Sequence, residues 1–116
     1  MSDSLSDLQQ SLKRFAEARD WGQFHSPKNL ASALVVEAGE LLEHFQWLTE
    51  AQSRELPDVE REAVAAEAAD VFLYLIQFCN SLGIDPIAAA RAKLKVNTEK
   101  YPVEVAKGSS QKYSRR

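Results

Sequence analysis

The sequence predicts an all-α protein, and three observations lead to that class. Apolar residues recur every three to four positions through most of the 116 residues, which is the period of an amphipathic helix. No stretch alternates apolar and polar residues for the length of a β-strand. Residues that begin, cap or end helices separate the periodic segments. Together these features predict a four-helix bundle.

Start signals define the first two helices. Ser4 stands before an apolar stripe as an N-cap, which begins a helix over about 5–19. Ser26, followed by proline, repeats the signal, because proline fits the first position of a helix. We therefore expect a second, longer helix over about 27–48. Residues 49–57 are expected to form a polar connection to the next helix.

The third and fourth helices are bounded by similar signals. Asp58 is placed to cap a helix over about 59–82. Gly83 would end that helix, because glycine adopts the left-handed conformation of a C-terminal cap without strain. Asp85 and the proline after it predict a fourth helix over about 86–100.

Length and composition predict one helical domain, residues 1–102, and a polar basic tail, 103–116, that we expect to be disordered. The net charge of −3 gives no reason to expect nucleic-acid binding. A single cysteine, Cys79, excludes an intrachain disulfide and a four-cysteine zinc site. Because no signal pattern and no apolar run of membrane-spanning length occurs, we expect a cytoplasmic protein without membrane association.

Two acidic pairs lie on the most apolar faces of the second and third helices. Glu37 interrupts the apolar stripe with Glu40 three residues on, and Glu67 and Asp70 repeat that spacing. Antiparallel helices would bring the pairs together, and neither face carries a lysine or arginine. Facing carboxylates must then be protonated or bind a cation. Oxygen ligands without cysteine suit Mg²⁺ or Mn²⁺, and substrate phosphates often complete a Mg²⁺ site.

Two other interpretations of the acidic pairs were weighed. A lone E-x-x-E on a helix is usually part of a solvated face, although two such pairs on apolar faces are less common by chance. A diiron bundle needs Glu-x-x-His on two helices. Here Glu40 and His44 are four residues apart and the pattern occurs once. His44 is better interpreted as a partner of Glu40 than as a metal ligand.

Flat and cationic side chains suggest a place for a phosphorylated ligand. Tyr74 follows Asp70 by four residues and so shares the carboxylate face. Lys93, Asn97 and Lys100 form one polar stripe on the fourth helix, either a solvated face or a clamp for phosphates. Four rings are candidates for stacking on a nucleobase, with core packing as the alternative: Trp21, Phe24, His25 and Trp47.

Three segments between about Leu8 and Pro102 resemble the all-α nucleoside triphosphate pyrophosphohydrolases of the MazG-like group, in particular its dCTP pyrophosphatase branch. They are RDWGQFHSPKNLASALVVEAGELLEHFQW, EAADVFLYLIQFCNSLGID and KLKVNTEKYP. The resemblance implies hydrolysis of a nucleoside triphosphate between its α and β phosphates, giving a monophosphate and pyrophosphate. It also implies a Mg²⁺ requirement and assembly as dimers or tetramers whose helices form intersubunit bundles.

By matched position, the resemblance assigns roles to individual residues. It implies the metal ligands Glu37, Glu40, Glu67 and Asp70. Base and sugar would contact Trp21, Phe24, His25, Trp47 and Tyr74, and phosphates would contact Lys93 and Asn97. Self-association would account for apolar residues expected on the back of the second and third helices: Val35, Leu42, Phe72, Leu75, Ile76 and Cys79.

The expected mechanism is metal-assisted attack of water on phosphorus, with Glu40 or Glu43 as general base. Two departures from the family pattern bear on the substrate. Val36 stands where many relatives carry an acid, and Leu12 where close relatives carry a histidine of the base pocket. The expected substrate is dCTP or a modified dCTP, in housecleaning of the nucleotide pool. Two alternatives stay open: a broad or non-standard nucleotide preference, and a non-catalytic helical oligomer that binds nucleotide or a protein partner.

Overall fold

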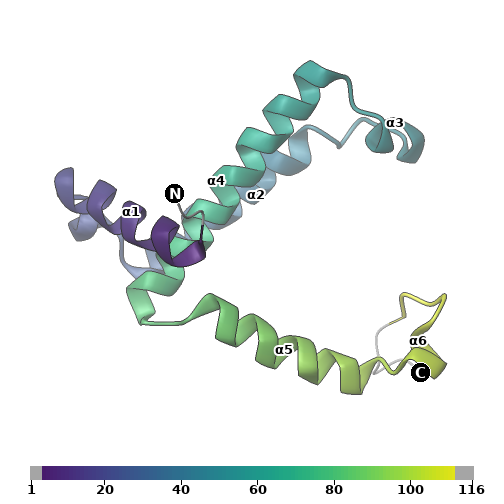
Figure 1. Cartoon of the computed structure of the whole chain (residues 1–116). Coiled ribbons are helices and arrows are strands. Elements are labelled where there is room, and N and C mark those ends of the chain that lie inside the picture. Colours follow the sequence, from purple (N-terminus) through teal and green to yellow (C-terminus); the bar gives the residue numbers. More distant parts are fainter. Residues whose placement is uncertain (1–3, 112–116) are drawn as a thin grey trace. The chain divides into compact units, whose positions relative to one another are not determined.

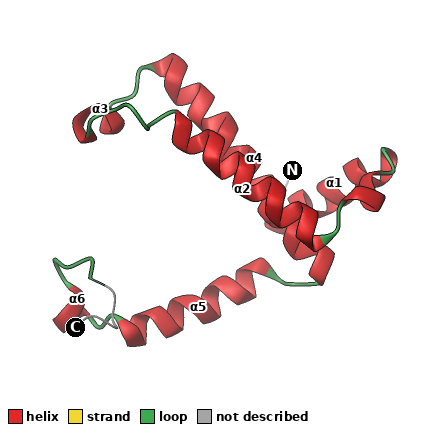
Figure 2. Cartoon of the chain, turned by 180° about the vertical axis from the view of Figure 1, so that it is seen from behind, coloured by secondary structure: helices red, strands yellow, loops and turns green. Residues whose placement is uncertain are grey.

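The protein is described here by a computed structural model that covers residues 4–111. All regular elements in this range are helical, as Figure 2 shows, and no strand occurs in it. The all-α class is therefore confirmed. In chain order the elements are α1 (Leu5–Ala18), the 3₁₀ helix η1 (Trp21–Phe24), α2 (Pro27–Glu43), α3 (Glu50–Arg54), α4 (Asp58–Leu82), α5 (Pro86–Lys100) and α6 (Val103–Ala106) (Figure 1).

The predicted caps form at most of the helix ends. The Ser4 and Ser26 hydroxyl oxygens each accept a hydrogen bond of 3.1 Å from the backbone N–H three residues on. Asp85 accepts two hydrogen bonds from the first turn of α5, at 3.0 and 3.1 Å. Gly83 ends α4 with φ of 66°, the left-handed conformation that glycine adopts without strain. Asp58 differs from its prediction, since it is the first residue of α4 and Pro57 precedes it as N-cap.

Helix α2 ends at Glu43, five residues before the predicted end at Leu48. Residues 44–47 form turns, in which the Leu42 carbonyl accepts hydrogen bonds from the N–H groups of Phe45 and Gln46 at 2.9 and 3.0 Å. The apolar spacing continues through this tightened turn, so periodicity alone places the end too late.

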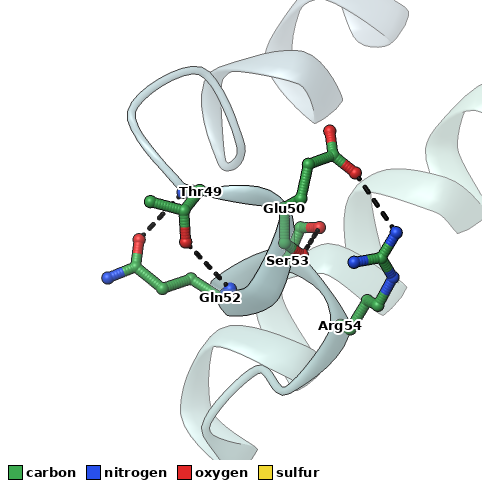
Figure 3. A network of polar contacts seen from close by, with 5 residues as sticks. All are labelled: Thr49, Glu50, Gln52, Ser53 and Arg54. Atoms are coloured by element: carbon green, nitrogen blue, oxygen red, sulfur yellow. Dashed lines mark hydrogen bonds and ion pairs between the residues drawn. The ribbon is translucent and has the colours of Figure 1, made fainter.

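The polar connection contains a short helix, α3, that the sequence analysis did not predict. Thr49 Oγ1 accepts a hydrogen bond from the Gln52 N–H at 3.1 Å, and Gln52 Oε1 accepts one from the Thr49 N–H at 2.9 Å (Figure 3). This reciprocal pair is a capping box, and its sequence signal is the T-x-x-Q spacing. Arg54 also reaches the Glu50 carboxylate at 3.5 Å.

The core of the N-terminal part forms where α4 meets α2 and α1. Helices α2 and α4 run antiparallel and side by side, joined through α3 (Figure 1). The side chains of Leu12, Leu30, Ile76 and Cys79 are buried there. Ile76 and Cys79 therefore pack inside this chain, which corrects their expected place on an uncovered back face. Their burial contributes apolar area removed from water, the main stabilising term of such a small core.

Other large apolar side chains of the two long helices are not covered by this chain. Val35 and Leu42 on α2 are 71% and 64% exposed, and Phe72 and Leu75 on α4 are 48% and 42% exposed. These four side chains therefore lie, as expected, on faces that the single chain leaves uncovered. Their exposure is the feature that the expected self-association would remove.

The chain divides into two compact units after Gly83. The second unit contains α5 and α6, and α6 forms in a stretch for which the sequence analysis expects no regular structure. The rest of the predicted tail, residues 112–116, lies outside the described residues, and the boundary at residue 102 stays a prediction. No single helix in the described range is both long and apolar enough to cross a membrane, although α4 and α5 taken together pass the same test.

Candidate functional site

Three carboxylates converge between α2 and α4. Helix α2 contributes Glu37, and one face of α4 contributes Glu67 and Asp70 through their spacing of three residues. One oxygen of each group lies within 4.8 Å of the others. Two oxygens bound to one Mg²⁺ lie at most about 4.2 Å apart. Small rotations of the side chains would therefore bring all three to one ion.

Two of these carboxylates, Glu37 and Glu67, are half-buried and each has an oxygen without a hydrogen-bond partner, whereas Asp70 is exposed. The Oε2 atoms of Glu37 and Glu67 are shielded from solvent and accept no hydrogen bond within the described chain. The ion pair found in residues 4–111 lies elsewhere, between Glu50 and Arg54. Shielded carboxylate oxygens without partners are costly, so the arrangement favours an added cation. A set of oxygen atoms suits a hard ion such as Mg²⁺ or Mn²⁺.

Crowding changes the protonation of Glu37. Its pKa is raised from 4.5 to about 7: desolvation is the largest cause, and a hydrogen bond with Glu40 and the charges of Glu40, Asp70 and Glu67 contribute in the same direction. Near neutral pH, Glu37 therefore holds a proton for much of the time unless a cation compensates the charge. Glu40 lies beside Glu37 but does not belong to the group of three converging carboxylates.

A cavity of about 380 Å³ adjoins the carboxylates, and Asp70 belongs to both. This volume lies in the range of small-molecule sites. Its wall combines α1, η1 and α4, and consists of Leu8, Ser11, Leu12, Phe15, Trp21, Asp70, Leu73, Tyr74 and Gln77. Trp21 and Tyr74, both predicted from the sequence, therefore line the same cavity as a carboxylate of the cluster.

The aromatic side of the cavity is built by ring contacts. Trp21 packs edge-on against Phe15 with ring centroids 5.4 Å apart, and His25 packs edge-on against Trp21 at 6.1 Å. The Arg19 guanidinium lies 3.7 Å from the Phe15 ring centroid, a cation–π contact. His25 lines a second cavity of about 290 Å³. The helical spacing of Phe15 places it on the apolar stripe of α1, but periodicity does not separate a core position from a cavity wall.

Other predicted site residues are not brought to this cavity. Phe24 is 59% exposed and Trp47 is 86% exposed, and neither lines either of the two cavities. Glu43, the last residue of α2, is exposed. Lys93 and Asn97 lie on α5 in the second unit, so their approach to the carboxylates stays a prediction.

Gln77 was not predicted from the sequence, yet it lines both cavities together with Leu12. Gln77 lies three residues beyond Tyr74 and seven beyond Asp70, so all three occupy one face of α4. That spacing could have marked it as a candidate. A glutamine amid apolar residues gives no chemical signal of its own.

Comparisons with known proteins agree with this architecture. The chain is 41% identical to dCTP pyrophosphatase 1 of Mus musculus and 39% identical to that of Homo sapiens, over 96% of its own length. It spans 66% of the length of each of these relatives. A solved structure of a pyrophosphatase from Archaeoglobus fulgidus DSM 4304 matches with a TM-score of 0.82 at 36% identity, covering 88% of this chain and 95% of that one.

The family comparison includes the carboxylate cluster. The model of the MazG-like family matches residues 33–115, a segment that holds Glu37, Glu67 and Asp70. The matched segment therefore contains most of α2, all of α4 and the three converging carboxylates that these helices carry. This chain belongs to the MazG-like family.

Proposed function

We propose that the chain is a Mg²⁺-dependent nucleoside triphosphate pyrophosphohydrolase that hydrolyses dCTP or a modified dCTP to the monophosphate and pyrophosphate. The observation that carries the proposal is the convergence of Glu37, Glu67 and Asp70 beside a ring-lined cavity that shares Asp70. A triphosphate needs a cation for its charge, and a nucleobase needs flat apolar walls. The names of the similar proteins add dCTP as the substrate to test first.

The residues present fit a divalent ion of the Mg²⁺ type. Glu37, Glu67 and Asp70 would hold it, since two of their oxygens are shielded and unpartnered. Glu40 is near enough to Glu37 to join them. A bound Mg²⁺ would supply Lewis-acid chemistry, neutralising charge on the phosphates.

The proton of the attacking water goes to a carboxylate. In the reaction, the water oxygen forms a bond to phosphorus, the bond between the α and β phosphates breaks, and pyrophosphate leaves. Glu40 suits the role of general base better than Glu43, because Glu40 is half-buried beside the cluster whereas Glu43 is exposed at the end of α2. A base must lie within hydrogen-bond reach of the water whose proton it accepts.

The cavity would hold the nucleoside. Trp21 and Tyr74 line it and offer flat surfaces to base and sugar. His25, Phe24 and Trp47 are proposed to contact the substrate from outside that wall. Lys93 and Asn97 of α5 are proposed to bind the phosphates in the complete enzyme, where charge-assisted hydrogen bonds from lysine favour phosphate oxygens.

Self-association is part of the proposal. The uncovered side chains of Val35, Leu42, Phe72 and Leu75 form the apolar surface that a second copy would cover. Light scattering after gel filtration tests this, and a mass well above 13.0 kDa is expected. A monomer at every concentration would contradict it. A cytoplasmic location and a housecleaning role in the nucleotide pool stay predictions.

The decisive test is product analysis with a panel of nucleotides. Wild-type protein and Mg²⁺ are incubated with the four dNTPs and 5-methyl-dCTP, and products are separated by chromatography. Monophosphate plus pyrophosphate from dCTP supports the proposal, whereas diphosphate plus phosphate would exclude it. Comparable turnover of all bases would favour the broad enzyme. Absence of turnover would favour the non-catalytic nucleotide-binding oligomer.

A matched pair of variants tests whether activity depends on the carboxylate cluster itself or on any acidic residue of α4. Glu67→Gln should abolish pyrophosphate release, because it removes a charge from the converging carboxylates. Glu62→Gln changes an exposed acid on the same helix and should leave release unchanged. Equal activity of both variants would remove the cluster from the mechanism.

A further inference from the structure

Gln77 carries a buried acceptor that the protein itself does not satisfy. Its Oε1 atom is shielded from solvent and accepts no hydrogen bond within the described residues. Leaving a buried acceptor unpaired is costly, so native structures rarely retain one without a reason. Among the groups that line the neighbouring cavity, the Ser81 hydroxyl already donates to the Phe78 carbonyl at 2.6 Å. Asn80 Oδ1, an acceptor, is bonded to the Gln9 side chain.

The position of Gln77 in the cavity wall also points to a role in binding a ligand. It lies on the cavity wall that also contains Asp70 and Tyr74, on the same face of α4. Asp70 and Gln77 are seven residues apart, about 10 Å along a helix axis. This separation matches the length of a nucleoside, with Asp70, which the proposed function places near the phosphates, at one end and the Gln77 amide at the other. The terminal torsion of glutamine is broad, so the amide turns into the cavity at little cost.

We infer that Gln77 is a specificity-determining residue that accepts a hydrogen bond from the exocyclic amino group of the nucleobase. The inference rests on the proposed function and names the chemical class of base. A 4-amino-pyrimidine presents an N–H donor at its edge, which supplies what Oε1 lacks. Thymine and uracil present a carbonyl oxygen at that position, which gives Oε1 no donor. A site built around a hydrogen bond discriminates against ligands that cannot make it.

The test measures binding rather than turnover, so it does not depend on the catalytic proposal. Calorimetry with Mg²⁺ compares dCMP with its 4-deamino analogue, the pyrimidin-2-one nucleotide, which lacks only the amino group. Wild type is compared with Gln77→Met, which keeps the length of the side chain and removes its hydrogen bonding. Gln10→Met makes the same change at an exposed position of α1 and is the matched control.

Wild type and Gln10→Met should bind dCMP about five- to tenfold more tightly than the analogue, the range of one hydrogen bond. In Gln77→Met this ratio should fall close to one, with a melting temperature equal to or above that of the wild type. An unchanged ratio in Gln77→Met overturns the inference, as does a wild type that binds neither nucleotide. A lower melting temperature with unchanged selectivity would assign Gln77 a structural role instead. Failure of pyrophosphate release, by contrast, bears on the proposed function alone.

Discussion

Carboxylates in two regions of this chain differ in whether they have a partner: one in α3 is paired with an arginine, and those between α2 and α4 are not. In α3, Glu50 pairs with Arg54 at 3.5 Å, and both side chains are largely exposed (Figure 3). Between α2 and α4, Glu37 and Glu67 each hold a shielded oxygen without any partner in the described chain. Solvent and the Arg54 guanidinium compensate the charge of Glu50. The shielded oxygens of Glu37 and Glu67 have no such compensation within the described chain, which favours a bound cation.

This difference indicates what each region is for. The groups of α3 satisfy one another, so their role is to begin and hold a short helix in the connection. The carboxylates of the α2–α4 cluster repel each other, which destabilises the folded chain unless an ion binds. Functional sites commonly retain unfavourable interactions such as this repulsion, whereas polar groups with a structural role are paired with one another.

Activity should separate the two regions most strongly. Asp70→Asn removes a carboxylate of the cluster that also lines the cavity, so kcat/KM for dCTP should fall by at least about a hundredfold, the scale of metal-assisted charge stabilisation. Glu50→Gln should stay within about twofold of the wild type. Pyrophosphate release at saturating Mg²⁺ is the measurement. Equal losses in the two variants would contradict the comparison.

Thermal stability should respond to Mg²⁺ through the cluster only. A Mg²⁺ concentration one hundred times its Kd should raise the melting temperature of the wild type by on the order of 10 °C, because binding favours the folded state. Glu37→Gln should lose most of that rise, while Glu50→Gln should keep it. Scanning calorimetry with and without chelator measures the shift. A rise of equal size in Glu37→Gln would show that Glu37 is not a ligand.

The pH dependence of stability should carry the signature of Glu37. Its pKa is about 7 in the folded chain and 4.5 as a free side chain. Between these values the folded state binds more protons than the unfolded state, so the metal-free protein loses stability as pH rises from about 4.5 to 7. Denaturant unfolding in chelator measures this slope. Glu37→Gln should flatten it, and a slope unaffected by the substitution would count against the crowding of these acids.

The same protonation should oppose metal binding. A proton on Glu37 competes with the ion, so Mg²⁺ affinity should fall as pH decreases below 7. With a pKa of about 7, the ionised fraction at pH 5.5 is roughly 25-fold smaller than at pH 7.5. Calorimetric titration at the two pH values checks this fall in affinity. Affinity independent of pH would contradict it.

The smallest effect belongs to the capping box of α3. Thr49→Ala removes one of its two reciprocal hydrogen bonds and should cost at most about 1 kcal/mol of unfolding free energy. The Mg²⁺-dependent rise in melting temperature should be unchanged, because Thr49 belongs to the capping box of α3 and not to the carboxylate cluster. Denaturant unfolding and a Mg²⁺ scan measure both quantities. A reduced response to Mg²⁺ would mean that the two regions are coupled.

The fold could be predicted where local chemistry decides it. Ser4, Ser26, Asp85 and Gly83 act through bonds or dihedral angles within a few residues, and each predicted end is observed. The end of α2 could not be predicted, because its apolar spacing continues into the turns after Glu43. Periodicity also does not tell which apolar positions the chain itself covers. Phe72 and Leu75 are exposed although their helix is apolar on most sides.

The site could be predicted in part for the same reason. The spacing of Glu67 and Asp70 fixes their common face, and the position of Glu37 on an apolar stripe required a partner. The register between α2 and α4 decides which carboxylates meet, and spacing within one helix does not contain that register. The converging oxygens belong to Glu37, Glu67 and Asp70, and the role of Glu40 beside Glu37 as a metal ligand stays a prediction. Gln77 was missed because its role depends on a cavity between helices. The predicted contact of Lys93 and Asn97 with the phosphates stays a prediction, because both residues belong to the second unit.

Direct binding of a divalent ion tests the central claim most simply. Mn²⁺, which favours the same oxygen ligands as Mg²⁺ and is visible by electron paramagnetic resonance, is titrated into metal-free protein. The wild type and Glu50→Gln should deplete the signal of free Mn²⁺ with a defined stoichiometry, and Asp70→Asn should not. A wild type that leaves the free signal undiminished, or an Asp70→Asn variant that binds as tightly, would contradict a metal site between α2 and α4.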